Sequence, residues 1–403
     1  MSTIYGPPVP GSAQQPPPVP WPPPGGPGGD GGAGSEPGGP ARRPRHRGAL
    51  AITAACAVLV MAAALGTALA LQTTPTAPPK PAPHTSAPVS GTSAVAAAVD
   101  PGLADVIATL GYQNAISEGT GMVLTSSGEV LTNNHVIDGA TSVKITDVGN
   151  GRTYTATVVG YDQADDIAVL QAQGASGLKT VTPGSSAKVT VGEAVIALGN
   201  AEGKGGTPAV ATGQVTGLNQ SITATNAAEH TSEQLTGLIR TNVPLQSGDS
   251  GGPLVTTAET VIGMNTAASS SYQFQSGTGQ AFAIPISQPA SVAGQIEAGR
   301  ASATIHIGAT GFLGIEAGQY VVPFTSTTEA VIVGVMPGLP AANAGLAAGD
   351  VIVSINGHAV TSPSGIQALL EPYHPGDQIS ITWQDLSGQT HTATVALATG
   401  PAG

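Results

Sequence analysis

Hydrophobic and polar positions follow different patterns in different parts of this 403-residue chain. From about residue 96 to 285, short β-branched runs alternate apolar and polar side chains, with Gly, Asn and Ser between the runs. A period of two predicts β-strands that each bury one face. Because long amphipathic helical patterns are missing from 115–285, the region 96–300 is predicted to be an all-β barrel or sandwich domain.

The turns in this region support the prediction. GMVLTSSGEVLTNN indicates a hairpin around Ser127-Gly128, and further strands are expected in TYTATVVGYD, DDIAVLQA, AVIALGN, PAVATGQVTGL and ETVIGMNTA. The stretch SQPASVAGQIEAGRAS, near 290–303, predicts one short helix that closes the domain.

Residues 305–403 show a mixed pattern. Strands are expected in GFLGIEAGQY, AVIVGVM, DVIVSING and ISITWQDLSGQTHTATVAL, with helices between them in AANAGLAAGD and SPSGIQALLEPYH. The fold class is therefore mainly β, with a smaller α+β domain at the C-terminal end.

The N-terminal region cannot bury a core. Residues 1–47 contain 14 of the 34 prolines, which predicts a disordered tail; the proline run in it could alternatively dock a proline-binding module. Residues 72–95 are expected to be a stiff, exposed linker.

Residues 49–71 carry no charge, so 48–71 is predicted to be a transmembrane helix. A helix of this length measures about 35 Å, enough to cross about 30 Å of hydrocarbon. Four arginines precede the run and no basic residue follows before Lys80, which places the N-terminus in the cytoplasm and the rest outside the cell membrane. The alternative is a cleaved signal peptide ending near Ala68-Leu69-Ala70, which would release a secreted protein.

Charge and cysteine content exclude several functions. The net charge of −12 argues against nucleic-acid binding by a basic surface. The single cysteine, Cys56, lies in the apolar run, so no intramolecular disulfide can form and a thiolate nucleophile is implausible. Histidines and carboxylates show no metal-ligand spacing, so neither a metal nor a cofactor is expected.

The strongest chemical signal is the glycine-rich sequence around Ser250, in GDSGGPL. A serine hydroxyl is a weak nucleophile unless a base is near and donors face the developing oxyanion. The glycines allow a tight turn, in which the backbone N–H groups of Gly248 and Ser250 are the expected oxyanion-hole donors.

The expected base is His135, the one histidine at the end of a predicted strand (VLTNNHVI). The others lie in the tail, the linker, an acidic loop or the smaller domain: His46, His84, His230, His306, His358, His374 and His391. Asp166 is the preferred orienting carboxylate because it abuts the strand IAVL, where burial is expected. Asp165 is its main rival, and Asp162 and Asp165 are otherwise expected to be solvated turn residues.

In the order His135, Asp166, Ser250, the motifs TNNHVI, DDIAVL and GDSGGPL resemble those of the trypsin-like HtrA (DegP) serine proteases. The resemblance covers roughly 96–400 and is greatest to PepA-like members from actinobacteria. It implies a chymotrypsin-like pair of β-barrels with the site between them, polypeptide substrates, and homotrimers, for which no residue pattern here gives independent support. Asp249 departs from the asparagine of most HtrA proteins, which leaves open whether activation requires processing.

In this fold the base of the primary specificity pocket lies just upstream of the nucleophile, near Pro244 and Leu245. No acid lies there, so cleavage after small or medium aliphatic residues is expected. Asn265, Thr266 and Ala267 are predicted to pair with the substrate backbone.

Phe312, Leu313, Gly314 and Ile315 resemble the carboxylate-binding loop of PDZ domains, in which consecutive N–H groups bind the C-terminus of a peptide. Ile366, Leu369 and Leu370 are the candidate side-chain pocket; the alternative is that they are only core residues. The sequence thus predicts a serine endopeptidase of exported or misfolded proteins, regulated or targeted by its PDZ domain. The competing hypotheses are a non-enzymatic scaffold or holding chaperone, and a peptide sensor whose protease only signals.

Overall fold

The computed structural model describes residues 91–226, 231–266, 272–274, 280–321 and 328–402. None of the helices in these ranges is long and apolar enough to cross a membrane. The predicted tail at 1–47, the transmembrane segment at 48–71 and the linker up to residue 90 lie outside the described residues. The end of the predicted linker is wrong, because helix α2 (Thr92–Val99) begins inside it and buries Val95 and Ala96 in the core.

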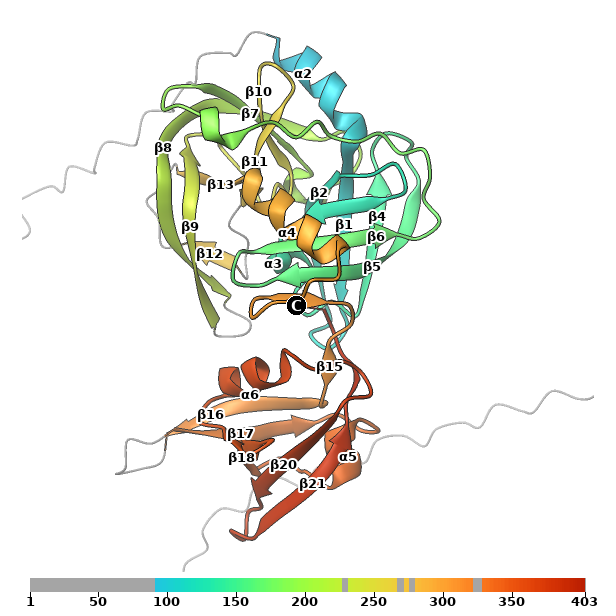
Figure 1. Ribbon diagram of the computed structural model, residues 1–403, viewed down its shortest axis with the longest axis vertical. Coiled ribbons are helices and arrows are strands. Elements are labelled where there is room, and N and C mark those ends of the chain that lie inside the picture. Colours follow the sequence, from blue (N-terminus) through green and yellow to red (C-terminus); the bar gives the residue numbers. More distant parts are fainter. Residues whose placement is uncertain (1–90, 227–230, 267–271, 275–279, 322–327, 403) are drawn as a thin grey trace, which may run out of the picture. The chain divides into compact units, whose positions relative to one another are not determined.

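The first barrel is a seven-stranded antiparallel sheet in the order β14-β5-β4-β1-β2-β3-β6, closed by pairing of β5 with β6 (Figure 1). Its strands are β1 (Leu103–Leu110), β2 (Ala115–Val123), β3 (Glu129–Thr132), β4 (Ser142–Asp147), β5 (Thr153–Asp162), β6 (Ile167–Ala172) and β14 (Ile305–Ile307). The hairpin predicted around Ser127-Gly128 is confirmed, since β2 pairs antiparallel with β3. Because β14 pairs with β5, the predicted start of the smaller domain at 305 is a few residues too early.

The second barrel repeats this plan, with the order β12-β8-β7-β10-β11-β13-β9 and closure by β8 and β9. Its strands are β7 (Ala194–Gly199), β8 (Ala209–Asn226), β9 (Thr231–Thr241), β10 (Pro253–Thr256), β11 (Val261–Thr266), β12 (Tyr272–Phe274) and β13 (Ala281–Pro285). Short helical segments are α3 (Asn134–Ile137), η1 (Asp100–Gly102), η2 (Ser186–Lys188) and η3 (Ala201–Gly203).

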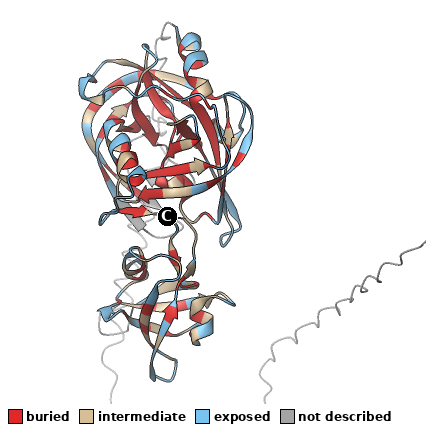
Figure 2. Ribbon diagram, turned by 45° about the vertical axis from the view of Figure 1, so that its right-hand side comes forward, coloured by how far each residue is buried: buried red, intermediate tan, exposed pale blue. Residues whose placement is uncertain are grey.

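One hydrophobic core joins the two barrels. It combines Leu103, Met122 and Leu131 of the first sheet with Ile196 and Met264 of the second, all fully buried. Figure 2 shows the buried residues gathered along the strands. The predicted closing helix is confirmed as α4 (Ser287–Glu297), which packs against β5 and β6. Helix α4 therefore ties the end of the second barrel to the first.

The smaller domain has a six-stranded sheet in which β16-β17-β18-β20-β21 follow one another and β19 pairs with β18. The strands of this sheet are β16 (Ile315–Val321), β17 (Thr328–Val335), β18 (Val351–Ile355), β19 (His358–Ala359), β20 (Gln378–Gln384) and β21 (Thr390–Ala396). Two further strands, β15 (Gly311–Phe312) and β22 (Ala398–Thr399), pair with each other. Both predicted helices are present, as α5 (Pro340–Ala344) and α6 (Pro363–Leu370). Ser362 caps α6 by accepting a hydrogen bond from the Gly365 amide at 3.1 Å.

Candidate active site

Three side chains that are far apart in sequence form one hydrogen-bonded chain. His135 lies in α3, Asp166 in the turn before β6, and Ser250 in the turn before β10. His135 Nε2 lies 2.9 Å from Ser250 Oγ, and His135 Nδ1 lies 2.9 Å from Asp166 Oδ2. The fold therefore brings together the three residues selected from sequence, with one imidazole nitrogen facing the hydroxyl and the other the carboxylate.

Asp166 is fully buried and its backbone has φ 56°, a left-handed conformation that aspartate tolerates better than most residues. Its carboxylate accepts hydrogen bonds from the backbone N–H of His135 at 3.0 Å and from Asn133 Nδ2 at 3.0 Å. The hydroxyl of Thr266 also donates to it, at 3.4 Å. Sequence reasoning missed Asn133 and Thr266 as partners of Asp166; the only local signal was the closeness of Asn133 to His135.

The prediction for Asp162 is wrong. It was expected to be a solvated turn residue, but it is only 2 % exposed. The hydroxyl of Thr304, which leads into β14, donates to it at 2.8 Å, and β14 covers the end of β5. Burial raises the pKa of the Asp162 carboxyl, and the hydroxyl of Thr304 opposes this rise. Asp165, the rival candidate, is half-buried, and its amide donates to Asp162.

The turn before β10 adopts a conformation that only glycine accommodates easily. Gly248 has φ 94° and Gly251 has φ 84°. A Cβ atom on Gly248 would collide with the carbonyl oxygen of Asn200, and one on Gly251 would collide with the carbonyl oxygen of Thr120. Ser250 is only 3 % exposed between them. The glycines of GDSGGPL are therefore required by close backbone approach as well as by turn geometry.

The carboxylate of Asp249, which precedes Ser250 in the turn, is bonded to the backbone of the turn itself. It is 5 % exposed, its Oδ2 accepts a hydrogen bond from the Gln246 amide at 2.8 Å, and its Oδ1 is buried without a hydrogen-bond partner among the described residues. Burial raises the pKa of Asp249, and the Gln246 amide opposes this rise. Asp249 therefore shapes the turn through one carboxylate oxygen.

The predicted substrate-binding residues have different surroundings in the structure. Pro244 is exposed and lines a pocket of about 390 Å³ with Gln246 and Asp249, and the half-buried Leu245 packs against the core of the second barrel. Asn265 is a correction: its backbone bonds to the Gly251–Gly252 segment on one side and pairs with β13 on the other.

Both edges of the strand are thus occupied at Asn265, and its side chain donates to the Pro253 carbonyl at 2.9 Å. Substrate pairing stays a prediction for the backbone of Thr266, whose hydroxyl is directed to Asp166, and for Ala267, which lies outside the described residues.

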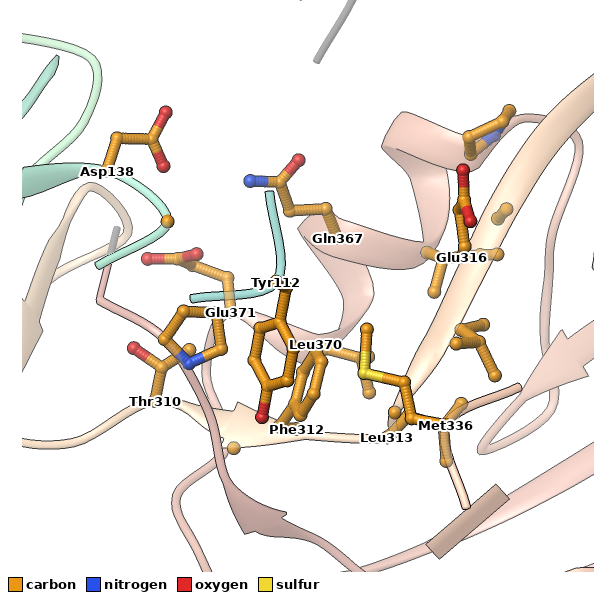
Figure 3. A pocket seen from close by; sticks show the side chains of 18 of the residues that line it. Tyr112, Asp138, Thr310, Phe312, Leu313, Glu316, Met336, Gln367, Leu370 and Glu371 are labelled. Atoms are coloured by element: carbon orange, nitrogen blue, oxygen red, sulfur yellow. The ribbon is translucent and has the colours of Figure 1, made fainter. Parts of the chain in front are cut away.

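A second candidate site lies in the smaller domain. A pocket of about 670 Å³ is lined by all six predicted peptide-binding residues: Phe312, Leu313, Gly314, Ile315, Ile366 and Leu370 (Figure 3). Ile366 and Leu370 also belong to the buried core of the domain, whereas Leu369, the other candidate, packs against that core and is not among the pocket-lining residues. Asp138, Glu316 and Glu371 add acidic groups to the lining, so the pocket combines an apolar floor with negative charge.

The loop between β15 and β16 is anchored by its carbonyl groups. The Leu313 carbonyl accepts from the Ala341 amide at 3.0 Å, and the Gly314 carbonyl accepts from the Met336 amide at 2.9 Å. Because C=O and N–H point in opposite directions across a trans peptide, the N–H groups of Gly314 and Ile315 face away from these anchors. Gly314 has φ 81°, which allows the turn. This arrangement is the one that binding of a terminal carboxylate requires.

Tyr112, in the turn between β1 and β2, also lines this pocket. Its ring stacks on that of Phe312, with centroids 5.4 Å apart and an interplanar angle of 28° (Figure 3). The Tyr112 side chain is not held within the protein core, since the residue is 48 % exposed. Sequence reasoning missed it because nothing in the β1–β2 turn indicates a contact with Phe312.

Comparison with known proteins agrees with this geometry. The family model of the trypsin-like peptidase domain matches residues 119–264, and that of the PDZ domain matches residues 331–385. Serine protease PepD of Mycobacterium tuberculosis is 34 % identical over 90 % of this chain and 80 % of its own length. Serine protease Do-like HtrA of Lactococcus lactis is 31 % identical over 70 % of this chain and 71 % of its own length.

The periplasmic serine endoprotease DegP of Salmonella typhimurium is 32 % identical over 67 % of this chain, a match that spans 54 % of that longer protein. The chain belongs to the HtrA-type serine proteases, with a trypsin-like peptidase domain followed by a PDZ domain. The family predicted from its motifs is confirmed, and the chain is a serine endopeptidase.

Proposed function

We propose that this endopeptidase cleaves peptide bonds with Ser250 as nucleophile, His135 as general base and Asp166 as the group that orients the imidazole. The observation that carries the proposal is the pair of 2.9 Å contacts that His135 makes, through Nε2 to Ser250 and through Nδ1 to Asp166. The additional bonds to Asp166 hold the carboxylate in place, so that it fixes the tautomer that leaves Nε2 free to accept a proton.

In the first step, Ser250 Oγ attacks the substrate carbonyl carbon while its proton passes to His135 Nε2. The negative charge that forms on the carbonyl oxygen is bound by the N–H groups of Gly248 and Ser250. His135 then gives the proton to the leaving amine, the C–N bond breaks, and an acyl-enzyme remains. Water, deprotonated by His135, attacks the ester carbon, and Ser250 leaves with the proton.

Hydrolysis of a fluorogenic peptide library by the full chain, with the matched variants Ser250→Ala and His135→Ala, tests these roles. Each variant is expected to lose kcat by about 10³-fold or more at nearly unchanged KM, because the residual rate comes from binding and the oxyanion hole alone. Asp165→Asn is the control for Asp166→Asn, since the 2.9 Å contact to His135 Nδ1 is made by Asp166. Equal losses in the two asparagine variants would reject Asp166 as the orienting group.

We further propose that the PDZ domain binds C-terminal peptides of exported or misfolded proteins and thereby targets or regulates cleavage. The anchored loop at Leu313–Gly314 supports carboxylate binding, and the apolar lining from Ile366 and Leu370 supports an apolar last residue. The carboxylates of Asp138, Glu316 and Glu371 favour a basic residue upstream. Binding of a peptide with a free C-terminus, and none of the same peptide amidated, is the expected result.

The N-terminal sequence supports a further proposal, that residues 49–71 anchor the chain in the cell membrane with the protease outside. The basis is the uncharged apolar run preceded by arginines. Fractionation of cells that produce the full chain tests it. Intact chain in the membrane fraction, open to external protease, is expected, whereas a shortened chain in the medium would favour the cleaved signal peptide.

A further inference from the structure

Thr120 belongs to strand β2 of the first barrel, yet its hydrogen bonds reach the catalytic turn before β10 of the second. It is 1 % exposed. Its backbone N–H donates to the Ser250 carbonyl at 2.8 Å, and its hydroxyl donates to the Gly248 carbonyl at 2.7 Å. The same hydroxyl accepts a hydrogen bond from the Asn200 amide at 2.8 Å. One residue thus connects β2, the end of β7 and, through its hydroxyl and its amide, the residues on both sides of Asp249.

These bonds hold the two peptides on either side of the one that carries the Ser250 N–H. The hydroxyl of Thr120 fixes the Gly248–Asp249 peptide, and the amide of Thr120 fixes the peptide that follows Ser250. In a trans peptide the N–H points opposite to the C=O, and the N–H groups of these two peptides, those of Asp249 and Gly251, bond to the carbonyls of Gln246 and Asn265. Neighbouring peptides share a Cα atom. Holding the peptide before Asp249 and the peptide after Ser250 therefore limits the rotation of the peptide between them, which carries the Ser250 N–H.

The peptide that carries the Gly248 N–H is held by the loop that Thr120 also contacts. The Ser247 carbonyl accepts from the Glu202 amide at 2.6 Å. This loop is closed by its own bonds, from the Gly203 amide to the Asn200 carbonyl at 2.9 Å and from the Gly205 amide to Asn200 Oδ1 at 2.5 Å. Because the loop begins at Asn200, whose amide ends on the Thr120 hydroxyl, removing that hydroxyl affects both anchors of the turn.

Thr120 is itself held in place. Its carbonyl accepts a hydrogen bond from the Thr132 hydroxyl at 2.7 Å, and Thr132 lies at the end of β3, close to His135 in the chain. Its methyl group lies against Gly252, where an added Cβ would be 3.3 Å away. The hydroxyl therefore has a fixed position, in which it donates one hydrogen bond and accepts another.

We propose that Thr120 is the positioning residue of the oxyanion hole: from the first barrel it holds the catalytic turn in the conformation that presents the N–H groups of Gly248 and Ser250. The inference rests on the catalytic roles proposed for the turn. It has a consequence for activation, because the turn is held by neutral groups inside the domain and does not need a newly formed N-terminal amine to pair with Asp249.

The test compares Thr120→Val, which keeps the shape and removes the hydroxyl, with Thr120→Ser, which keeps the hydroxyl, both in the full chain. For Thr120→Val we expect kcat to fall by about 10- to 100-fold at nearly unchanged KM, somewhat less than for loss of an oxyanion donor itself. Affinity for a peptide boronic acid, whose tetrahedral adduct occupies the oxyanion hole, should fall by a similar factor, whereas Thr120→Ser should restore both values to near wild type.

Thr256→Val is the matched control, since in the described part of the chain the Thr256 hydroxyl bonds within its own hairpin, to Thr260 and the Ala258 amide. It should leave kcat unchanged. If Thr120→Val does not fold, as judged by its thermal transition, Thr120→Ala replaces it.

Three results would overturn the inference. The first is a wild-type kcat in Thr120→Val, and the second is a rise in the KM of Thr120→Val with no change in its kcat. The third is that Thr120→Ser loses as much kcat and boronate affinity as Thr120→Val. An inactive wild type would instead reject the proposed function, so the two failures are distinguishable.

Discussion

Two anion-binding turns in this protein use the same backbone device and anchor it differently. In each turn, a glycine with positive φ follows a carbonyl that accepts from a backbone amide, so the glycine N–H points the other way. Gly248 follows Ser247, which accepts from Glu202, and Gly314 follows Leu313, which accepts from Ala341. The PDZ loop is anchored by the amides of Ala341 and Met336, which belong to its own domain. The catalytic turn has backbone anchors as well, but it also depends on a side-chain hydroxyl, that of Thr120, from the opposite barrel.

The difference matters because a backbone anchor survives nearly every substitution, whereas a hydroxyl can be removed by one. The PDZ loop is thus expected to be robust, as suits a module that binds and releases peptides. The catalytic turn depends on the packing of two barrels around Thr120 and Asn200. A change that disturbs the packing of either barrel is therefore expected to disturb the geometry of the turn.

The largest effect is expected from Gly248→Ala. The new Cβ would collide with the Asn200 carbonyl oxygen, and the alanine would have to adopt φ 94°, which a residue with a side chain rarely does. The turn must therefore move, and the oxyanion donor moves with it. Peptide hydrolysis should lose about 10²- to 10³-fold in kcat. Gly151→Ala, also at positive φ but with no atom within 4 Å of the added Cβ, is the control and should retain activity. Comparable losses in both variants would mean that backbone strain alone, not the turn, is responsible.

Gly314→Ala makes the corresponding change in the PDZ loop. Residue 314 has φ 81°, and a Cβ added there would collide with the side chain of Leu339. Affinity for a C-terminal peptide, measured by fluorescence anisotropy, should fall about tenfold or more, which corresponds to about 1.4 kcal/mol. Hydrolysis of a short peptide without a PDZ ligand should be unchanged, because the contacts of Gly314 with Met336 and Leu339 lie within the PDZ domain. Loss of basal hydrolysis would contradict the separate anchoring of the two turns.

Tyr112→Ala should have a smaller effect of the opposite sign. A peptide that enters the pocket has to displace or share the stacked pair of Tyr112 and Phe312, and such pairs contribute about 0.5–1.5 kcal/mol. Peptide affinity should therefore rise by about 2- to 10-fold, the range that this free energy represents. Tyr112→Phe, which keeps the ring, should match wild type. Weaker binding by Tyr112→Ala would show that Tyr112 contributes to the site instead of occupying it.

The smallest effect on activity is expected from Asp249→Asn, because the amide oxygen can still accept from Gln246. Stability should respond to pH. Burial raises the folded-state pKa of Asp249 above its ordinary value, so this carboxyl favours the folded state below about pH 4 and loses that contribution as pH rises through the folded-state pKa.

Asp249→Asn should therefore raise Tm at pH 7 and not at pH 3.5, with kcat near wild type. A loss of kcat at pH 7 as large as that of Asp249→Ala would show that the charge itself holds the turn.

The fold and the three residues of the proposed triad could be predicted because local motifs encode them. Ser250 lies in a turn that its glycines define, and His135 and Asp166 each adjoin a strand. The burial of Asp162 could not be predicted, because its partner Thr304 is 142 positions away. The paired edges of Asn265 could not be predicted either, because the strand pattern of a segment does not say which neighbours flank it in the closed barrel. The role of Thr120 was hidden for the same reason, since its partners at Asn200 and Gly248 are 80 and 128 positions away.

The most direct test of the central claim is covalent labelling of the full, unprocessed chain with a fluorophosphonate, followed by mass spectrometry of the peptide adducts. The account predicts a stoichiometric adduct on Ser250, slower labelling in Thr120→Val, and none in Ser250→Ala. Labelling that requires prior cleavage of the chain, or an adduct on another serine that persists in Ser250→Ala, would contradict it.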